Sequence, residues 1–204
     1  MTKRISAKKK VSRSLSVNLW GRANDTFNKR NFRPGQHGGA LKRETTYGTQ
    51  LRAKQKLKKY YANINETQFK NTFLKAKTQK GDTAETFIGL LERRLDAVIY
   101  RANFVPTMQS ARQTVGHKHI LVNGKMVNIP SYLVKPGDVI EVKESARKIP
   151  LIVDSLAKME RDVPAYMNLD AENFSVKFNA VPHIEDVPYP VVMDVNLIVE
   201  FYSR

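Results

Sequence analysis

Arginines in the middle of the chain recur at a spacing that would let one surface hold a polyanion. Arg94 and Arg101 lie seven residues apart, so on one helix they would share a flank of the apolar stripe of residues 87–102. Arg112 falls beside the apolar face of the next expected helix, and Gln113 falls opposite that face. We therefore expect a two-helix corner whose cationic side faces outward. Such a surface could bind phosphate groups.

Catalysis has much weaker support in the residue patterns. Arg94-Leu95-Asp96 matches the catalytic Arg-Leu-Asp of pseudouridine synthases in letters, but it falls mid-helix with Asp96 expected on a polar flank. Those enzymes also need a large catalytic domain that this chain cannot accommodate. His117 and His119 are spaced like two metal ligands, yet no Cys or carboxylate lies nearby in sequence to complete a site. The sequence shows no Ser/His/Asp or Cys/His arrangement of the kind used in nucleophilic catalysis. We expect no catalytic residues, no cofactor and no metal.

Local signals place the cations on helices and a small sheet. Thr107 follows Pro106 and is a natural N-cap for the second helix. Asn123-Gly124 predicts a two-residue hairpin, because both central residues of such a turn take φ > 0. Residues 139–143 alternate with period two, which is typical of a strand. The expected unit is a helix pair packed on a small antiparallel sheet.

The charge of the chain favours a nucleic-acid partner. The 204 residues include 35 Lys and Arg against 19 Asp and Glu, which gives a net charge of +16 and a pI near 10.0. Residues 1–60 hold 17 of these cations against two acids, whereas residues 149–204 hold four cations against nine acids. The absence of cysteine excludes disulfides and thiolate zinc sites. No run approaches the roughly 20 apolar residues of a membrane span, so we expect no membrane partner.

The N-terminal segment is predicted to be a basic arm that becomes ordered only against phosphates. A disordered tail and a Ser-rich, basic organelle transit peptide are the two alternatives. The segment of residues 33–39 is rich in turn residues and lacks both the Lys-Ser/Thr ending and the preceding strand of a nucleotide-binding P-loop. It is therefore interpreted as an RNA-contacting loop, with a structural connector as the alternative.

Two further helices and a C-terminal region surround the middle of the chain. A helix from Thr49 to about residue 61 carries cations over much of its surface, which suits a phosphate backbone, although a solvated helix is the alternative. A second helix is expected over residues 66–76, and Asp82 with Glu85 forms a plausible capping box for the next. Pro150 can begin another helix. Extended pieces at residues 166–169, 173–178 and 195–202 are predicted to close back on residues 50–90.

Several segments together resemble a known family. The segments LLERRLDAVIYRANF, SARQTVGHKHILVNGKMVNIPSY and KPGDVIEV resemble the S4 RNA-binding domain. The sequence outside this domain is similar to the S4 family of bacterial and organellar small-subunit ribosomal proteins. The similar segments are residues 18–22, 33–38, 47–48, 50–59 and 197–204. Some members carry a four-cysteine zinc knuckle near the N-terminus, and this chain resembles the cysteine-free version.

The resemblance implies an α+β fold, with a mostly helical N-terminal domain, a basic extended arm and an inserted S4 domain. The implied divisions are an arm at 1–46, a helical domain at 47–91, an S4 domain at 92–148, and at 149–204 a C-terminal helix and short strands that pack back on the helical domain. The residues and the resemblance together predict the following rRNA-binding residues: Arg22, Lys29, Arg30, Arg33, Gln36, His37, Arg52, Lys54, Lys56, Lys58, Arg94, Arg101, Thr107, Arg112, Gln113, His117, Lys118, His119 and Lys125.

The implied function is that of a structural, non-enzymatic constituent of the small ribosomal subunit. It would bind a helix junction in the 5′ domain of the rRNA, nucleate assembly there, and later contribute to mRNA entry and accuracy beside neighbouring ribosomal proteins. Candidates for mRNA entry are Lys42, Arg43 and Arg52. The location would be a bacterial or organellar ribosome, including that of the mitochondrial matrix, and the chain would not work as an isolated homo-oligomer.

Two other functions remain open from the sequence. One is an RNA-modifying enzyme that uses the module for targeting, and the other is a free-standing RNA chaperone. A first test follows from the expected outward arginines: Arg94→Ala with Arg101→Ala should loosen rRNA binding and leave the fold intact.

Overall fold

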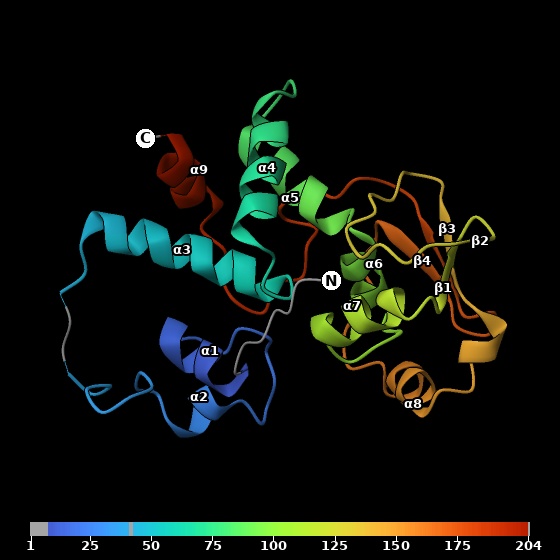
Figure 1. Ribbon diagram of the computed structural model, residues 1–204, viewed down its shortest axis with the longest axis horizontal. Helices are drawn as coiled ribbons and strands as arrows, with labels where there is room; N and C mark the ends of the chain where they lie inside the picture. Colours follow the sequence, from blue (N-terminus) through green and yellow to red (C-terminus); the bar gives the residue numbers. More distant parts are fainter. Residues whose placement is uncertain (1–7, 41–42, 204) are drawn as a thin grey trace. The chain divides into compact units, whose positions relative to one another are not determined.

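The computed structural model describes residues 8–40 and 43–203, and these fall into two compact units (Figure 1). The terminal unit comprises the described residues of Met1–Lys75 together with those of Tyr189–Arg204, and the central unit is Ala76–Pro188. The central unit is thus inserted in the chain of the terminal unit. Lys42, one of the expected mRNA contacts, lies outside the described residues, as do residues 1–7 of the predicted arm.

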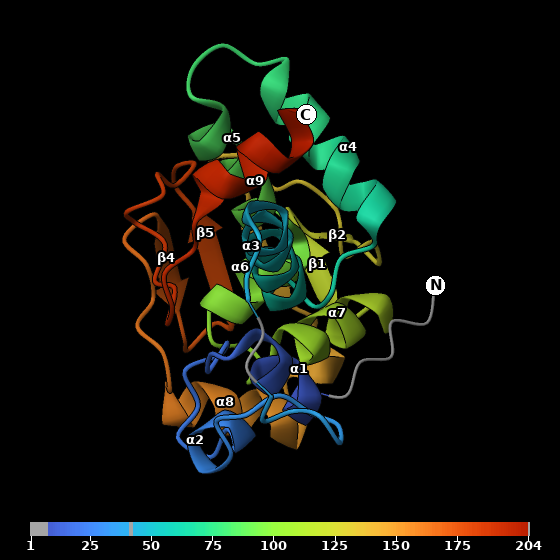
Figure 2. The same cartoon turned by 90° about the vertical axis from the view of Figure 1, so that its left-hand side faces the viewer.

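The terminal unit is helical. Its core forms where apolar faces of the third, fourth and last helices meet, with Leu57, Tyr60, Phe69, Phe73 and Ile198 almost fully buried. The last helix lies beside the third in both views (Figures 1 and 2). The helices of this unit are α1 (Lys8–Leu15), α2 (Thr26–Lys29), α3 (Thr46–Tyr60), most of α4 (Glu66–Lys77) and α9 (Val195–Ser203).

Residues 8–29 form two short helices, which the sequence patterns did not predict. Val11 and Leu15 of α1 and the following Leu19 are buried. The Ser12 hydroxyl donates to Oδ2 of Asp25 at 2.8 Å, and Oδ1 of Asp25 accepts from the backbone N–H of Phe27 at the start of α2. This part of the predicted arm therefore has packing and hydrogen bonds of its own.

The central unit begins with a helix that ends earlier than its periodicity suggested. Asp82 caps α5 (Thr83–Glu92) as predicted, by accepting from the backbone N–H of Ala84 at 3.1 Å. The expected continuous helix to residue 102 is wrong, because the chain bends at residues 93–94 before α6 (Leu95–Arg101). Backbone hydrogen bonds to residues outside the helix stabilise the bend. The N–H of Leu95 donates to the carbonyl of Tyr132 at 2.9 Å, and the N–H of Val134 donates to the carbonyl of Arg93 at 2.8 Å.

A helix pair and a five-stranded antiparallel sheet complete this unit. The pair is α6 with α7 (Met108–Gly116), which pack against each other. The sheet has the order β2-β1-β3-β5-β4. Asn123 and Gly124 form the predicted two-residue turn, with φ of 49° and 74°. The remaining elements are β1 (Ile120–Val122), β2 (Lys125–Met126), β3 (Val139–Val142), the 3₁₀ turn η1 (Glu144–Ala146), α8 (Pro150–Lys158), β4 (Met167–Asp170) and β5 (Ser175–Phe178).

The C-terminal region differs from its prediction in two ways. Strand β5 pairs with β3, and β4 pairs with β5, so these strands extend the central sheet instead of closing back on residues 50–90. Residues 195–203, predicted to be extended, form the helix α9. The segment is rich in β-branched and aromatic residues, but Val195 and Ile198 are buried at helical spacing in the terminal unit, and this tertiary packing overrides the local propensity.

Within the described ranges, no helix is long and apolar enough to cross a membrane.

Candidate nucleic-acid interface

Six of the predicted residues fall in one short stretch of the central unit, between α7 and β2. Helix α7 supplies Arg112 and Gln113, the loop after it supplies His117, Lys118 and His119, and β2 supplies Lys125; we call this set the α7–hairpin face. Arg112 and His119 are half-buried, and the other four are exposed. The sequence has no Asp or Glu between Asp96 and Asp138, so this stretch adds cations without adding carboxylates. Such a surface attracts a phosphate backbone.

The turn between α7 and β1 has a well-defined backbone geometry. Lys118 has φ of 64°, a left-handed conformation that turns the chain out of α7 and into β1. The backbone N–H of Lys118 donates to the carbonyl of Val115 at 2.9 Å. The rings of His117 and His119 meet edge to face, with centroids 5.9 Å apart. One short turn therefore carries two imidazoles and one ammonium group.

Arg112 sits close to a buried ion pair. Burial lowers the pKa of its guanidinium, the carboxylate of Asp96 opposes that effect, and Arg94 adds to it. Arg94 donates from Nη2 to Oδ2 of Asp96 at 2.9 Å and from Nε to Oδ1 at 3.1 Å. Asp96 thus holds one arginine directly and lies near a second, half-buried one.

Two predicted contact residues of the helix corner are not on the surface. Arg94 is 4% exposed and Arg101 is 2% exposed, so the expectation that both look outward is wrong. The bend at residues 93–94 places Arg94 at the N-cap of α6, where it pairs with Asp96, and Arg101 pairs with Glu92 of α5. Their partners are carboxylates of the same unit. The burial of Asp96 also removes it from any substrate, which leaves the Arg-Leu-Asp match without an accessible carboxylate.

Thr107 has a structural task that accounts for its position. Its Oγ1 accepts from the backbone N–H of Ser110 at 2.9 Å, and its hydroxyl also bonds to that of Ser110 at 2.6 Å. The predicted N-cap is confirmed. The hydroxyl is thereby engaged at the start of α7, although its predicted contact with rRNA remains a prediction.

Four of the five cations of α3 are paired with carboxylates of the terminal unit. Lys54 and Lys58 each donate to Glu66 at 2.9 Å, Lys56 lies 3.4 Å from Asp194, and Arg52 pairs with Glu44. Lys54 is 6% exposed, and its ammonium lies 4.3 Å from the ring centroid of Phe201. Part of the positive charge predicted for this helix is therefore neutralised within the unit.

Glu66 accepts hydrogen bonds from three side chains of this unit. Burial alone would raise the pKa of its carboxyl, but hydrogen bonds from Lys54, Lys58 and Tyr202 outweigh burial and lower the pKa to about 2. Burial, together with the hydrogen bond to Glu66, raises the pKa of Tyr202 above its ordinary value. Glu66 thus ties α4 to α3 and α9.

Lys29 lies on α2, and the other predicted residues of the arm lie in the segments before and after this helix. Arg22, Lys29, Arg30, Gln36 and His37 are exposed. Arg33 is half-buried, and its Nη2 lies 3.5 Å from Oε1 of Glu44. A groove of about 550 Å³ opens beside this pair, and its lining includes Arg33, Arg43, Glu44, Arg52 and Lys59.

Comparison with known proteins gives these surfaces a context. Residues 3–92 match the family described as "Ribosomal protein S4/S9 N-terminal domain", and residues 93–140 match the "S4 domain". The chain is 55% identical to the small ribosomal subunit protein uS4 of Pelagibacter ubique, 54% to that of Azorhizobium caulinodans and 51% to that of Rhodospirillum rubrum, and each alignment covers 100% of both chains.

The chain belongs to the uS4 family of small ribosomal subunit proteins. The resemblance that the sequence motifs carry is thereby confirmed, in its cysteine-free form. Proteins of the uS4 family are named as ribosomal constituents and not as enzymes. Within the described part of the chain, no group of three or more His, Asp or Glu side chains is placed to hold a metal ion.

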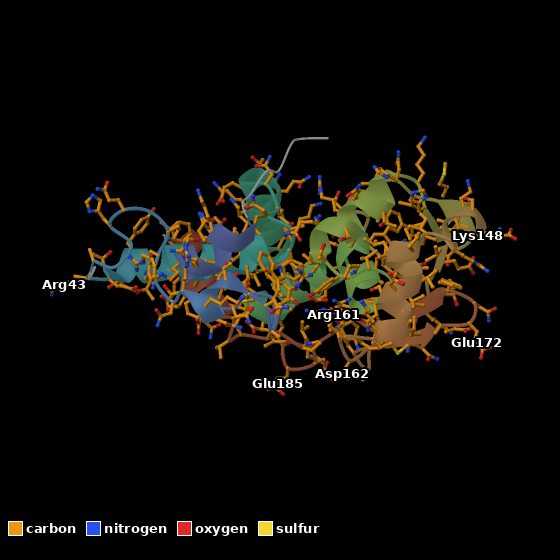
Figure 3. All side chains as sticks on the ribbon, turned by 90° about the horizontal axis from the view of Figure 1, so that it is seen from below. Arg43, Lys148, Arg161, Asp162, Glu172 and Glu185 are labelled. Atoms are coloured by element: carbon orange, nitrogen blue, oxygen red, sulfur yellow. The ribbon has the colours of Figure 1, made fainter. Side chains whose placement is uncertain are left out.

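Further cations of the chain were not among the predicted rRNA contacts. Arg93 is half-buried, and its Nε donates to the carbonyl of Val134 at 2.9 Å. Lys135, Lys143 and Lys148 are exposed in the central unit, and Arg43 is exposed in the terminal unit. Figure 3 shows Arg43 and Lys148 reaching away from the ribbon. Charge alone could have selected them, but only their exposure separates them from buried cations such as Lys54.

Proposed function

We propose that this uS4-family chain is a structural constituent of the small ribosomal subunit and that it binds small-subunit rRNA through the α7–hairpin face. The observation that carries the proposal is that Lys118 and Lys125 of that face are exposed, in a stretch without acids and inside the S4-domain match. Phosphate contacts from such a surface supply affinity and orientation without reading individual bases.

The proposed target is a junction of helices in the 5′ domain of the rRNA, bound early so that assembly begins there. Support comes from the resemblance and from the presence of cations on each unit: those of the α7–hairpin face on the central unit, and Arg22, Lys29 and Arg30 on the terminal unit. Contacts from both units to one folded RNA would favour its shape over that of a simple duplex.

Co-sedimentation tests this proposal. The tagged chain, expressed in bacterial cells, should migrate with small subunits through a sucrose gradient at moderate salt. The purified chain should also bind a transcript of the rRNA 5′ domain more tightly than duplex RNA of equal length in a filter-binding titration. Migration away from ribosomes would instead favour an RNA chaperone, and equal affinity for both RNAs would contradict the proposed junction.

The finer roles at mRNA entry and in accuracy are part of the same proposal. Arg43 is exposed and Arg52 lines the same groove, so both can meet an anionic strand. In a reconstituted system, ribosomes that carry Arg43→Ala should translate structured mRNA more slowly than parent ribosomes do. On unstructured mRNA the two kinds of ribosome should have similar rates. The acidic C-terminal region offers carboxylates to a basic neighbouring ribosomal protein. The named relatives are bacterial, which favours a bacterial ribosome over an organellar one.

A further inference from the structure

We infer that the Glu44 carboxylate competes with RNA phosphate for Arg33 and Arg52 in the groove beside the start of α3, and that it occupies this site when RNA is absent. The inference rests on the proposed function, since it names a site and a built-in competitor for the same class of ligand. It concerns the terminal unit alone and not the α7–hairpin face.

The geometry places two guanidiniums on one carboxylate oxygen. Arg33 reaches Oε1 of Glu44 with Nη2 at 3.5 Å, and Arg52 reaches the same oxygen with Nη1. These arginines come from segments on either side of Glu44 in sequence, one from the turn-rich loop and the other from α3. Glu44 thus sits where the positive ends of both side chains converge.

The groove holds more positive charge than Glu44 can neutralise. Its lining includes Arg43 and Lys59 besides Arg33 and Arg52, so four cationic residues and one carboxylate line the groove. Burial lowers the pKa of Lys59, and the neighbouring Lys58 adds to that effect. An excess of charge in a groove of about 550 Å³ favours an anion larger than a carboxylate.

A phosphodiester suits this site better than Glu44 does. Its two non-bridging oxygens can accept from two guanidinium forks at once, whereas Glu44 presents a single oxygen to both arginines. The N-terminus of α3 adjoins the groove through Thr45 and Gly48, and no acidic residue lies in its first turn, so the helix dipole also favours negative charge there.

The present occupant is easily displaced. The side chains of Arg33 and Arg52 are 30% exposed and that of Glu44 is 39% exposed, and ion pairs in such surroundings contribute little to stability. A phosphate that enters the groove would repel the Glu44 carboxylate, which can swing into solvent. Glu44 therefore shields two arginines in the absence of RNA and lowers the affinity for RNA.

The test removes the carboxylate and keeps its shape. Glu44→Gln should bind a transcript of the small-subunit rRNA 5′ domain about three- to tenfold more tightly than the parent chain at about 0.1 M salt, because no ion pair has to be broken. The matched control is Glu200→Gln, which removes the same charge from the same unit at a side chain that accepts from the Gln50 amide at 2.9 Å. The control should stay within about twofold of the parent.

A second background shows whether the gain passes through the two arginines. In an Arg33→Ala, Arg52→Ala chain, Glu44→Gln should no longer raise the affinity, because the cations that it releases are gone. Equal affinities of Glu44→Gln and Glu200→Gln would overturn the inference. A weaker Glu44→Gln variant would also overturn it, since Glu44 would then act by ordering the loop.

A probe without RNA separates this inference from the proposed function. Inorganic triphosphate is titrated into the ¹⁵N-labelled full chain, and the Nε–Hε signals of Arg33 and Arg52 are followed by NMR. Those signals should shift at lower triphosphate concentration in Glu44→Gln than in the parent chain or Glu200→Gln. If this holds while no variant binds the rRNA transcript, the site stands and the proposed function fails. Unshifted arginine signals would overturn the site.

Discussion

Arg101 and Glu92 form a two-pronged ion pair inside the central unit. Nη2 of Arg101 lies 2.8 Å from Oε1 of Glu92, and Nε lies 3.1 Å from Oε2. Both side chains are almost completely enclosed, at 2% and 0% exposure. Tyr166 donates its hydroxyl to the same carboxylate at 3.0 Å, and Nη1 of Arg101 donates to the carbonyl of Pro188. One pair therefore joins α5, α6 and two later segments of the unit.

Loss of Arg101 should destabilise the fold. Arg101→Ala would leave Glu92 charged and buried without its partner, and we expect the free energy of unfolding to fall by about 3–5 kcal/mol. Urea denaturation followed by circular dichroism measures this. Lys177→Ala, at an exposed site of β5, should change the same quantity by less than about 0.5 kcal/mol. A stable Arg101→Ala chain with weakened rRNA binding would restore the expectation that this arginine looks outward.

The α7–hairpin face should show the opposite behaviour. Lys118→Gln with Lys125→Gln removes two exposed charges while keeping the side-chain stems, so we expect weaker binding of the rRNA transcript and an unchanged unfolding curve. The slope of log affinity against log salt should decrease in magnitude by about 0.7–0.9 for each phosphate that the variant no longer neutralises. Filter binding at several salt concentrations measures both effects. Lys177→Gln serves as the matched control, and an equal weakening there would speak for a general charge effect.

Thr107 offers a way to separate capping from RNA contact. Thr107→Ala removes the side-chain acceptor for the backbone N–H of Ser110 and should lower the free energy of unfolding by about 1 kcal/mol. Thr107→Ser keeps the acceptor and should retain most of that stability. Thermal and urea unfolding of the three chains measure the difference. If Thr107→Ala unfolds like the parent but binds rRNA less well, its hydroxyl acts on the RNA and not on α7.

Glu66 predicts an acid-sensitive terminal unit. The pKa of its carboxyl is about 2 in the folded chain and near its ordinary value of 4.5 when unfolded, so between these values the unfolded chain binds more protons. The stability that Glu66 contributes is therefore complete above about pH 4.5 and is lost as the pH falls toward about 2.

Replacement of this carboxylate should remove that dependence. Glu66→Gln should be less stable than the parent at neutral pH, and the gap should close as the pH falls through this window. Urea unfolding followed by the fluorescence of Trp20, the single tryptophan, measures it within the same unit. A gap between parent and Glu66→Gln that stays constant with pH would exclude the ion-pair network as its source.

Short-range chemistry was readable from the sequence. Thr107 and Asp82 cap their helices, Asn123-Gly124 makes the turn, and Pro150 begins α8, because each of these depends on the backbone of a few adjacent residues. The excess of cations and the sequence motifs of the S4 family were equally visible, since neither depends on how the chain is folded. The exposed members of the α7–hairpin face could therefore be named in advance.

The tertiary structure decided which cations are available. Arg94 and Arg101 have the spacing of a surface pair on one helix, but the bend held by Tyr132 and Val134 turns them toward Asp96 and Glu92. Periodicity assumes an uninterrupted helix and cannot register hydrogen bonds that arrive from some 40 residues away. The helical state of residues 195–203 and the pairing of Arg33 and Arg52 with Glu44 likewise depend on contacts that form only when distant segments meet.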